Sequence, residues 1–341
     1  MRRLCPIGYT IIIGSRHDVF SWLLWYVRDS YAQLAPVYRL ELVYTKWRQK
    51  TIRERSSTAL SMKESSTISD NVSNLATSAI ELRDVTKRFL TPTGQAYTAI
   101  RDVTLSVAPG EFCAVVGPTG CGKSTTLGLI SGLERPSEGS VQVMGEPVQG
   151  IDPRIGYVFQ SDAVFPWRNV LSNVATGPSF RGRPKAEALA RAHDWIARVG
   201  LAGFERHYPH QLSGGMRKRV ALAQTFINEP QILLMDEPFS ALDVQTRALM
   251  EDELLHLWSS LQASVVFVTH DLEEAISLAD RVCVLTSGPG TVKGIYPIDL
   301  PRPRKVEDIR FAPRFIELYQ QIWEDLREEV LISYERNKQR V

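Results

Sequence analysis

The sequence has few cysteines and no apolar run long enough to cross a bilayer. Only four of its 341 residues are cysteine, and none stands in a C-x-x-C spacing, so we expect neither a zinc site nor a disulfide framework. This cysteine usage fits a reducing cytosol. Residues 19–27 are rich in aromatic side chains, but Arg16, His17 and Asp18 interrupt the apolar run, which stays short of the roughly 18–20 residues that a membrane span needs. No apolar core and small-residue cleavage site follow Arg2 and Arg3, so a secretory signal is not expected either.

The chain also lacks a strong net charge. Its formal charge is +2 at pH 7, with eleven basic and six acidic residues among residues 1–79 and an acidic excess in the remainder. A basic field that would indicate nucleic-acid binding is therefore missing. Apolar content of 44% and charged content of 23% are typical of a soluble globular protein, and the length allows a full core.

Residues 1–79 differ in composition from the rest. Twelve of the 29 residues from 51 to 79 are Ser or Thr, which is typical of a flexible linker. We interpret 1–79 as a disordered extension or as translation from an upstream start. The alternative is an interfacial anchor that uses Trp22, Trp25 and Trp47 with neighbouring basic residues.

From residue 80 onward the pattern predicts an α/β fold. Residues 79–89 and 104–112 alternate apolar and polar side chains, which indicates an antiparallel sheet. A helix is expected over 184–201, where apolar residues recur every three or four positions. The remaining predicted strands are 140–148, 154–160, 231–236, 264–270 and 281–286. Since most of these alternate with helical stretches, we expect a mostly parallel sheet covered on both faces.

The segment GPTGCGKST, residues 117–125, fits a phosphate-binding loop between a strand (111–116) and a helix (125–133). Its glycines let backbone amides point at a polyphosphate, Lys123 adds positive charge, and Ser124 offers a hydroxyl to Mg²⁺. A chance match in a Gly-rich loop is the alternative, and the flanking strand and helix argue against it. The expected nucleotide-binding residues here are Gly117, Pro118, Thr119, Gly120, Cys121, Gly122, Lys123, Ser124 and Thr125.

Polar residues also end three of the predicted strands. Asp236 is placed to hold Mg²⁺, and Glu237 to polarise a water that attacks the γ-phosphorus. His270 closes the next strand and can contact the γ-phosphate, while the amide of Gln160 can contact Mg²⁺ or water. Taken singly, each has a plain alternative: a solvated turn for the acidic pair, and a structural or exposed side chain for the histidine.

A second glycine-rich helix start follows at LSGGM, residues 212–216. Ser213, Gly214 and Gly215 precede a clear helix, so this helix N-terminus can also bind an anion. Because the loop at 117–125 already holds the one γ-phosphate of a nucleotide, we expect this site to serve a nucleotide held by another subunit. The expected assembly is a head-to-tail dimer with two ATP molecules between the copies. The alternative is a simple helix cap on Ser213.

Together these motifs resemble the nucleotide-binding subunit of ABC transporters, from about residue 80 to the end. The matching segments are Walker A (117–125), the Q-loop Gln160, the LSGGM signature, Walker B (232–237), the D-loop SALD (240–243) and the H-loop His270. The chain departs from the family in having Met216 where many members have Gln, and in carrying the preface 1–79.

The resemblance implies a role for each of these residues. Lys123 and the 117–125 backbone would bind phosphates, and Ser124, Gln160 and Asp236 would serve Mg²⁺. Glu237 would be the general base and His270 the γ-phosphate switch. Ser213 and Gly215 would reach the partner's ATP, and Asp243 would signal across the dimer. Phe89 would stack on adenine, with Tyr97 as a rival.

Within the family, segments 165–174 and 292–304 resemble the nitrate, sulfonate, taurine and bicarbonate importer branch. This implies ATP-driven import of a small anion through a separate permease, with a periplasmic or extracellular solute-binding protein, at the cytoplasmic face of the inner membrane. An importer head for a solute that is not an anion is the alternative. Phe165, Pro166 and Trp167 would dock the permease, or else pack under the helical subdomain.

The expected organisation is an extension (1–79), a nucleotide-binding domain (80–295) with a helical subdomain at about 165–225, and a tail (296–341). The tail is predicted to form an amphipathic helix that packs on the domain through Phe315, Leu318, Ile322, Leu326 and Val330.

Soluble ABC ATPases are the competing class. Those that act on DNA insert long coiled coils between Walker A and the signature, whereas only 96 residues separate Gly117 from Ser213 and no heptads occur between them. Translation factors of this type carry two heads in one chain, and one head is found here. An inactive regulatory head is not expected because Lys123, Asp236, Glu237 and His270 are all present.

Overall fold

The computed structural model describes residues 78–91 and 94–338, and the expectations for residues 1–77 lie outside that range. By internal contacts, the described residues 78–89 and 97–338 belong to one compact unit. Of the other unit, the structure describes residues 90, 91 and 94–96, where the Thr91 N–H donates to the Gln95 carbonyl at 2.8 Å and closes a turn. No helix among the described residues is long and apolar enough to cross a membrane.

A six-stranded sheet forms the centre of the larger unit, in the order β10-β9-β3-β8-β7-β6. The strands β9, β3, β8, β7 and β6 pair in parallel, and β10 is antiparallel to β9. The bounds are β3 (Phe112–Val116), β6 (Ile155–Val158), β7 (Ile232–Asp236), β8 (Ser264–Thr269), β9 (Arg281–Leu285) and β10 (Val292–Pro297). Every residue of β3, β7 and β8 is buried, as expected when both faces are covered. The predicted mostly parallel sheet is confirmed.

A second sheet of four strands, β2-β1-β4-β5, is antiparallel where β4 pairs with β1 and with β5. Its strands are β1 (Ile80–Leu90), β2 (Ala96–Val107), β4 (Glu138–Val143) and β5 (Glu146–Pro147). The prediction of one strand over 104–112 is wrong: the chain turns between β2 and β3, where the Glu111 N–H donates to the Ala108 carbonyl at 3.2 Å. The predicted strand 140–148 is likewise split, because Met144 and Gly145 both take positive φ values, 50° and 76°.

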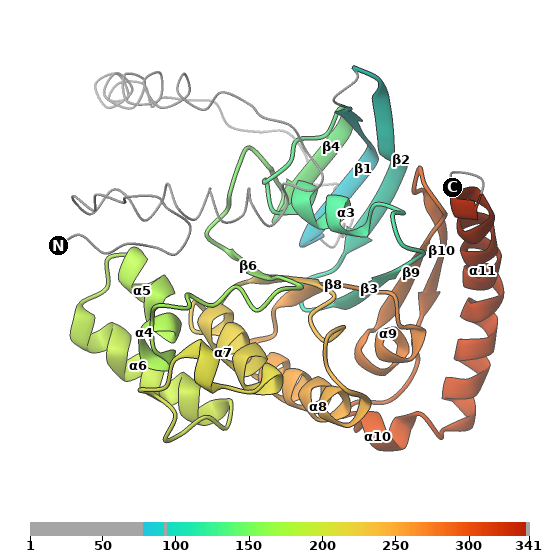
Figure 1. Ribbon diagram of the computed structural model, residues 1–341. Coiled ribbons are helices and arrows are strands. Elements are labelled where there is room, and N and C mark those ends of the chain that lie inside the picture. Colours follow the sequence, from blue (N-terminus) through green and yellow to red (C-terminus); the bar gives the residue numbers. More distant parts are fainter. Residues whose placement is uncertain (1–77, 92–93, 339–341) are drawn as a thin grey trace, which may run out of the picture. The chain divides into compact units, whose positions relative to one another are not determined.

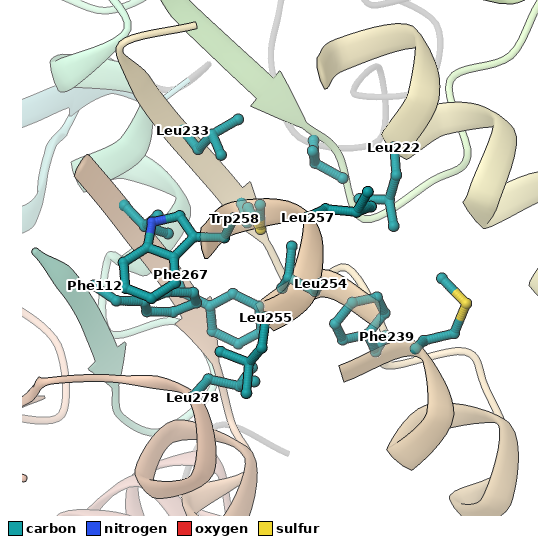
Figure 2. Packing of buried hydrophobic residues seen from close by; sticks show 14 of the residues in the cluster. Phe112, Leu222, Leu233, Phe239, Leu254, Leu255, Leu257, Trp258, Phe267 and Leu278 are labelled. Carbon is teal, nitrogen blue, oxygen red and sulfur yellow. The ribbon is translucent and has the colours of Figure 1, made fainter. Parts of the chain in front are cut away.

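Alternation along the central strands divides the core into two layers. Phe112, Val265 and Phe267 face one side of the sheet with the other members of a cluster that includes the helices α7 (Gly214–Phe226), α8 (Val244–Leu261) and α9 (Leu272–Leu278). Figure 2 shows this layer: Phe112 and Phe267 meet α8 residues, and the rings of Phe112 and Trp258 pack edge to face with centroids 5.3 Å apart.

The opposite side of the central strands carries the second layer. Cys113, Val115 and Val268 pack here with the buried side chains of the four-stranded sheet and of α3 (Lys123–Ile130). The period of two along a strand thus explains why neighbouring residues of β3 enter different clusters. Cys113 and Cys283 are buried members of this layer, as small core residues.

Four helices group together (Figure 1): α4 (Val170–Val174), α5 (Thr176–Phe180), α6 (Lys185–Arg198) and α7, of which α7 also packs on β6. A 3-10 turn, η2 (Pro209–Gln211), precedes α7. The loop before α4 is fixed by the fully buried Asn173, which accepts from the Phe165 N–H at 2.7 Å and donates to the carbonyls of Phe165, Arg168 and Asn169. Helix α6 lies within the predicted 184–201.

The tail forms α10 (Val306–Ile309) and α11 (Pro313–Lys338), and α11 packs on β9, β10 and α9 (Figure 1). Phe315, Leu318, Ile322 and Leu326 are buried as predicted, but Val330 is 39% exposed, so its assignment to the buried face is wrong. A step of three from Leu326 reaches Glu329, which is buried instead; it accepts from the Ser287 N–H at 2.7 Å and pairs with Lys293 at 3.0 Å.

Candidate functional site

The loop 117–122 joins β3 to α3, the strand-loop-helix arrangement that the motif requires. Gly120 and Gly122 have φ values of 81° and 98°, in the left-handed region that favours glycine. Gly117 is needed for a close approach, because a Cβ there would lie 2.7 Å from the Cys121 sulfur and 3.0 Å from the Leu285 carbonyl oxygen. The loop therefore leads directly into a helix N-terminus, where free amides and the helix dipole favour an anion.

Lys123 opens α3 and is nearly buried, with 6% of its side chain exposed. Its ammonium donates to the carbonyls of Gly117 at 2.9 Å and Pro118 at 3.3 Å, and lies 3.9 Å from Glu237 Oε1. The cation is thus held against the inner side of the loop, next to the carboxylate expected to act as base.

Ser124 and Asp236 meet across the site, since the Ser124 hydroxyl donates to Asp236 Oδ1 at 3.1 Å. Burial raises the pKa of Asp236, while hydrogen bonds from Ser124 and Tyr157 oppose that shift. The two oxygens supply the ligand type that Mg²⁺ takes in proteins. Across residues 78–91 and 94–338, no three His, Cys, Asp or Glu side chains are grouped to hold a metal, so a cation here would draw further ligands from phosphate and water.

Glu237 is contacted from three sides. Its Oε2 lies 3.0 Å from His270 Nδ1 and accepts from Gln160 Nε2 at 3.4 Å, while Oε1 faces Lys123. Its backbone has a φ of 42°, uncommon for a residue other than glycine, and its N–H donates to the Val268 carbonyl at 2.9 Å. The sharp turn after β7 thereby aims the carboxylate at the same space as Lys123 and His270.

Sheet topology explains why these residues converge. β7 lies between β6 and β8 in parallel register. Gln160 follows β6, Asp236 ends β7, and His270 follows β8, so all three reach the carboxyl edge of the sheet, where α/β folds bind ligands. The clustering predicted for Lys123, Ser124, Gln160, Asp236, Glu237 and His270 is what the structure has.

The signature and D-loop residues lie at two other helix starts. Ser213 caps α7 by accepting from the Met216 N–H at 3.2 Å, and Asp243 caps α8 by accepting from the Thr246 N–H at 2.9 Å. A Cβ on Gly215 would lie 3.1 Å from Thr246 Cγ2, so the two starts are neighbours. Among the described residues, no hydrogen bond or ion pair joins 213–215 to 117–125 of the same chain.

The two aromatic candidates for adenine occupy different surroundings. Phe89 is half-buried beneath the Lys87 ammonium, 4.7 Å from the ring centroid. Tyr97 is exposed, and its hydroxyl lies 3.7 Å from where a Gly288 Cβ would be, a position also 3.3 Å from the Gly120 carbonyl. Tyr97 therefore lies near the phosphate loop, which gives weight to the rival; the assignment of Phe89 stays a prediction.

Three supporting residues were not anticipated from sequence. Tyr157 hydrogen-bonds Asp236. Arg247 donates to Asp271, the residue after His270, at 2.9 Å and to the Leu242 carbonyl at 3.3 Å, joining the D-loop to the H-loop. Lys218 reaches the backbone at Gln160. None of these three residues has a recognisable sequence signal, whereas Asp271, the partner of Arg247, has one as a polar residue directly before a helix.

The chain is similar in sequence to known ATP-binding proteins. A family model described as ABC transporter matches residues 100–240. An uncharacterized ABC transporter ATP-binding protein of Methanocaldococcus jannaschii, MJ0412, is 48% identical over 240 residues, covering 70% of this chain and 88% of its own. The nitrate import ATP-binding protein NrtD of a Synechocystis species is 42% identical (65% and 83%), and the aliphatic sulfonates import ATP-binding protein SsuB of Bacillus licheniformis is 37% identical (70% and 91%).

A solved structure shows the same fold. The ATP-binding cassette MJ0796, described as a dimeric post-hydrolysis state bound to ADP and Pi, aligns with a TM-score of 0.58 at 32% identity, covering 65% of this chain and all of its own. The present chain belongs to the ABC transporter ATP-binding proteins. It is an α/β P-loop ATPase that binds and hydrolyses ATP.

Proposed function

We propose that this chain is the ATP-hydrolysing subunit of an importer that takes up a small anion such as nitrate, an aliphatic sulfonate or taurine. The names of NrtD and SsuB support this class of solute. It would act as a peripheral protein on the cytoplasmic face of the inner membrane, with a permease and a periplasmic or extracellular solute-binding protein. The importer head for another kind of solute remains the alternative.

The observation that carries the catalytic part is the surroundings of Glu237, with His270 at 3.0 Å, Gln160 at 3.4 Å and Lys123 at 3.9 Å. In the proposed mechanism the 117–125 amides and Lys123 hold the phosphates, and Lys123 offsets charge that develops on them. Glu237 orients and deprotonates the attacking water. His270 holds the Glu237 carboxylate on one side and meets the γ-phosphate on the other.

Ser124, Asp236 and Gln160 would hold Mg²⁺, which the oxygen donors of Ser124 and Asp236, 3.1 Å apart, fit. The ion, when bound, neutralises charge on the β- and γ-phosphate oxygens. Burial raises the pKa of the Asp236 carboxyl, and a cation beside it would oppose that shift by favouring the ionised form.

We propose that Ser213, Gly214 and Gly215 complete the site of a second copy in a head-to-tail dimer, with Asp243 at the joint between the copies. Two observations support this. The N-terminus of α7, 13 residues long, begins with two glycines, and within 78–91 and 94–338 no hydrogen bond or ion pair joins residues 213–215 to the phosphate loop. The relative MJ0796 is described as a dimer.

The permease would dock on the helical subdomain. A surface hollow of about 520 Å³ lies between the loop before α4 and the helices α4 to α6, and is lined by Trp167, Phe180 and Arg183 among others. Trp167 is 51% exposed and Pro166 is exposed, whereas Phe165 is buried. Trp167 and Pro166 are therefore available to a partner helix, and Phe165 packs in the core.

Replacing Glu237 by Gln tests the mechanism. The variant keeps the side-chain volume but cannot accept the proton, so we expect ATP binding to persist, turnover to fall by about a hundredfold or more, and an ATP-bound dimer to accumulate. A nucleotide-binding assay measures ATP binding, steady-state phosphate release measures turnover, and light scattering measures the accumulation of the dimer. Hydrolysis at the parental rate would show that Glu237 is not the base.

A further inference from the structure

Lys218 is a buried cation that no part of the proposed reaction uses. It lies in the second turn of α7, and 2% of its side chain is exposed. Its ammonium donates to the carbonyl of Gln160 at 3.0 Å and of Phe159 at 3.3 Å, and lies 3.6 Å from Asp162 Oδ1. A buried ammonium needs such partners, because an unpaired charge away from water is costly.

The neighbouring Arg217 strengthens the same connection. Its Nε donates to Asp162 Oδ2 at 2.9 Å, and its Nη1 donates to the Leu212 carbonyl at 2.9 Å. Two successive cations of α7 thus hold the segment 159–162, and one of them also reaches the residue before Ser213. The segment that carries Gln160 is tied to the helix whose start carries the signature.

We infer that Lys218 is a positioning residue that sets where the Gln160 side chain meets magnesium and the attacking water, and that links this placement to α7. The Gln160 amide reaches Glu237 only at 3.4 Å, near the limit of a hydrogen bond, so a small backbone displacement decides whether the contact forms. Any movement of α7 is passed to the backbone at Gln160 through the Lys218 ammonium. The inference rests on the role proposed above for Gln160.

A double-mutant cycle tests this link. Lys218→Met keeps the apolar stem but leaves two buried carbonyls without their donor, so we expect kcat to fall about tenfold and the Mg²⁺ requirement to rise. The ATP dissociation constant without Mg²⁺ should stay unchanged, since 117–125 is untouched. In a Gln160→Ala background the same change should cost no further activity. If the two losses multiply, Lys218 does not act through Gln160.

Two further variants separate positioning from packing. Lys218→Gln restores an amide donor toward the carbonyls and should recover most of kcat and the parental Mg²⁺ requirement. Arg219→Gln is the matched control, because Arg219 is the next cation of α7 but contacts the Val199 carbonyl and Glu253 instead; it should leave the Mg²⁺ requirement unchanged. An equal shift in the Arg219→Gln variant would reduce the Lys218 effect to general loosening of α7 and overturn the inference.

Amide hydrogen exchange over residues 159–162 gives a reading independent of catalysis. Exchange should quicken in the Lys218→Met variant and not in Arg219→Gln; unchanged exchange would overturn the link. Should Gln160→Ala itself turn over at the parental rate, the role proposed for Gln160 fails, while the exchange result still decides whether the link exists. If Lys218→Met does not fold, Asp162→Asn weakens the same contact from the exposed side and must show the same non-additivity with Gln160→Ala.

Discussion

At the scale of residues, the site depends on a few backbone positions that allow little substitution. Gly120 and Gly122 adopt left-handed φ values, and Glu237 adopts one without being a glycine. Gly290 also packs closely against the backbone of the phosphate loop. Its N–H donates to the Ala99 carbonyl at 2.9 Å, and a Cβ on Gly290 would lie only 1.9 Å from the Cys121 carbonyl oxygen.

Gly290→Ala should therefore weaken ATP binding although Gly290 is not one of the proposed phosphate ligands. The added methyl must push the loop backbone at Cys121, and we expect the ATP dissociation constant to rise about tenfold, as for strain of 1–2 kcal/mol. Fluorescent-nucleotide titration measures it. Gly150→Ala is the control, because a Cβ there meets no atom within 4 Å; equal effects in the two variants would contradict the packing argument.

Lys123→Ala removes the only side-chain cation that contacts the loop carbonyls among the described residues near 117–122. We expect ATP affinity to fall by about a hundredfold, the range for loss of a charge-assisted contact to phosphate. Isothermal titration without turnover provides the measurement, and unchanged affinity would contradict the assignment of the loop.

Most of the residues that cluster around Glu237 could be predicted from the sequence, because the motifs give their order along the chain and the ends of the predicted strands give their location. The supporting residues Lys218 and Arg247 could not be predicted in this way. Lys218 and Arg247 act through contacts made across elements that are 58 and 24 residues away in the chain, and a lysine or arginine on a helix has the same local pattern whether it faces solvent or a carbonyl.

At the scale of elements, the packing of α8 against α9 buries two carboxyl groups. Burial raises the pKa of Glu274 to about 8 and that of Glu251 to about 7. The Thr269 hydroxyl donates to Glu274, and Arg310 pairs with Glu251 at 3.1 Å. The Glu274 contact joins α9 to the end of β8, next to His270, and the Glu251 contact joins α8 to the residue after α10.

Glu274→Gln should stabilise the protein at alkaline pH and not at acid pH. Between the unfolded value of about 4.5 and the folded value of about 8, the native state binds a proton that the unfolded state releases, so stability falls as pH rises through this window. Glutamine stays neutral. We expect a thermal midpoint about 3–6 °C above the parent at pH 8.5 and near equality at pH 4.5. A pH-independent difference in calorimetry would contradict this.

Periodicity predicted the buried strands and the helix α6, whose patterns are set by burial on one or both faces. It failed where the chain reverses. Residues 104–112 alternate in polarity through a turn, and Met144 adopts a left-handed conformation that its identity does not indicate. In α11 the helical spacing of three or four residues allows either Glu329 or Val330 to be the next buried residue after Leu326. Glu329 is the buried one, and it forms an ion pair with Lys293.

At the scale of the whole molecule, the predicted nucleotide-binding residues form two separate groups. The loop 117–125 and the acidic edge lie together, while the starts of α7 and α8 lie beside each other elsewhere. The helical subdomain adds a surface hollow of about 520 Å³ with Trp167 on its rim. The sequence predicts that residues 213–215 lie apart from the loop 117–125, but the motif order does not predict the hollow.

Trp167→Ala should leave ATP hydrolysis by the isolated subunit unchanged, because Trp167 lies in the hollow and not at the carboxyl edge of the sheet. It should weaken assembly with the permease in detergent by about tenfold or more, as loss of an exposed aromatic anchor does. Surface binding to the immobilised permease measures this. Arg198→Ala, on α6 but outside the hollow, is the control; parental binding by the Trp167 variant would rule out docking there.

The most direct test is a structure of the Glu237→Gln variant with ATP and Mg²⁺. The account predicts two copies related head to tail, each with the γ-phosphate held by its own Lys123 and by Ser213 and Gly215 of the opposing copy at hydrogen-bond distance. A structure in which 213–215 of the opposing molecule lie far from the terminal phosphate, with the nucleotide enclosed by one chain, would contradict it.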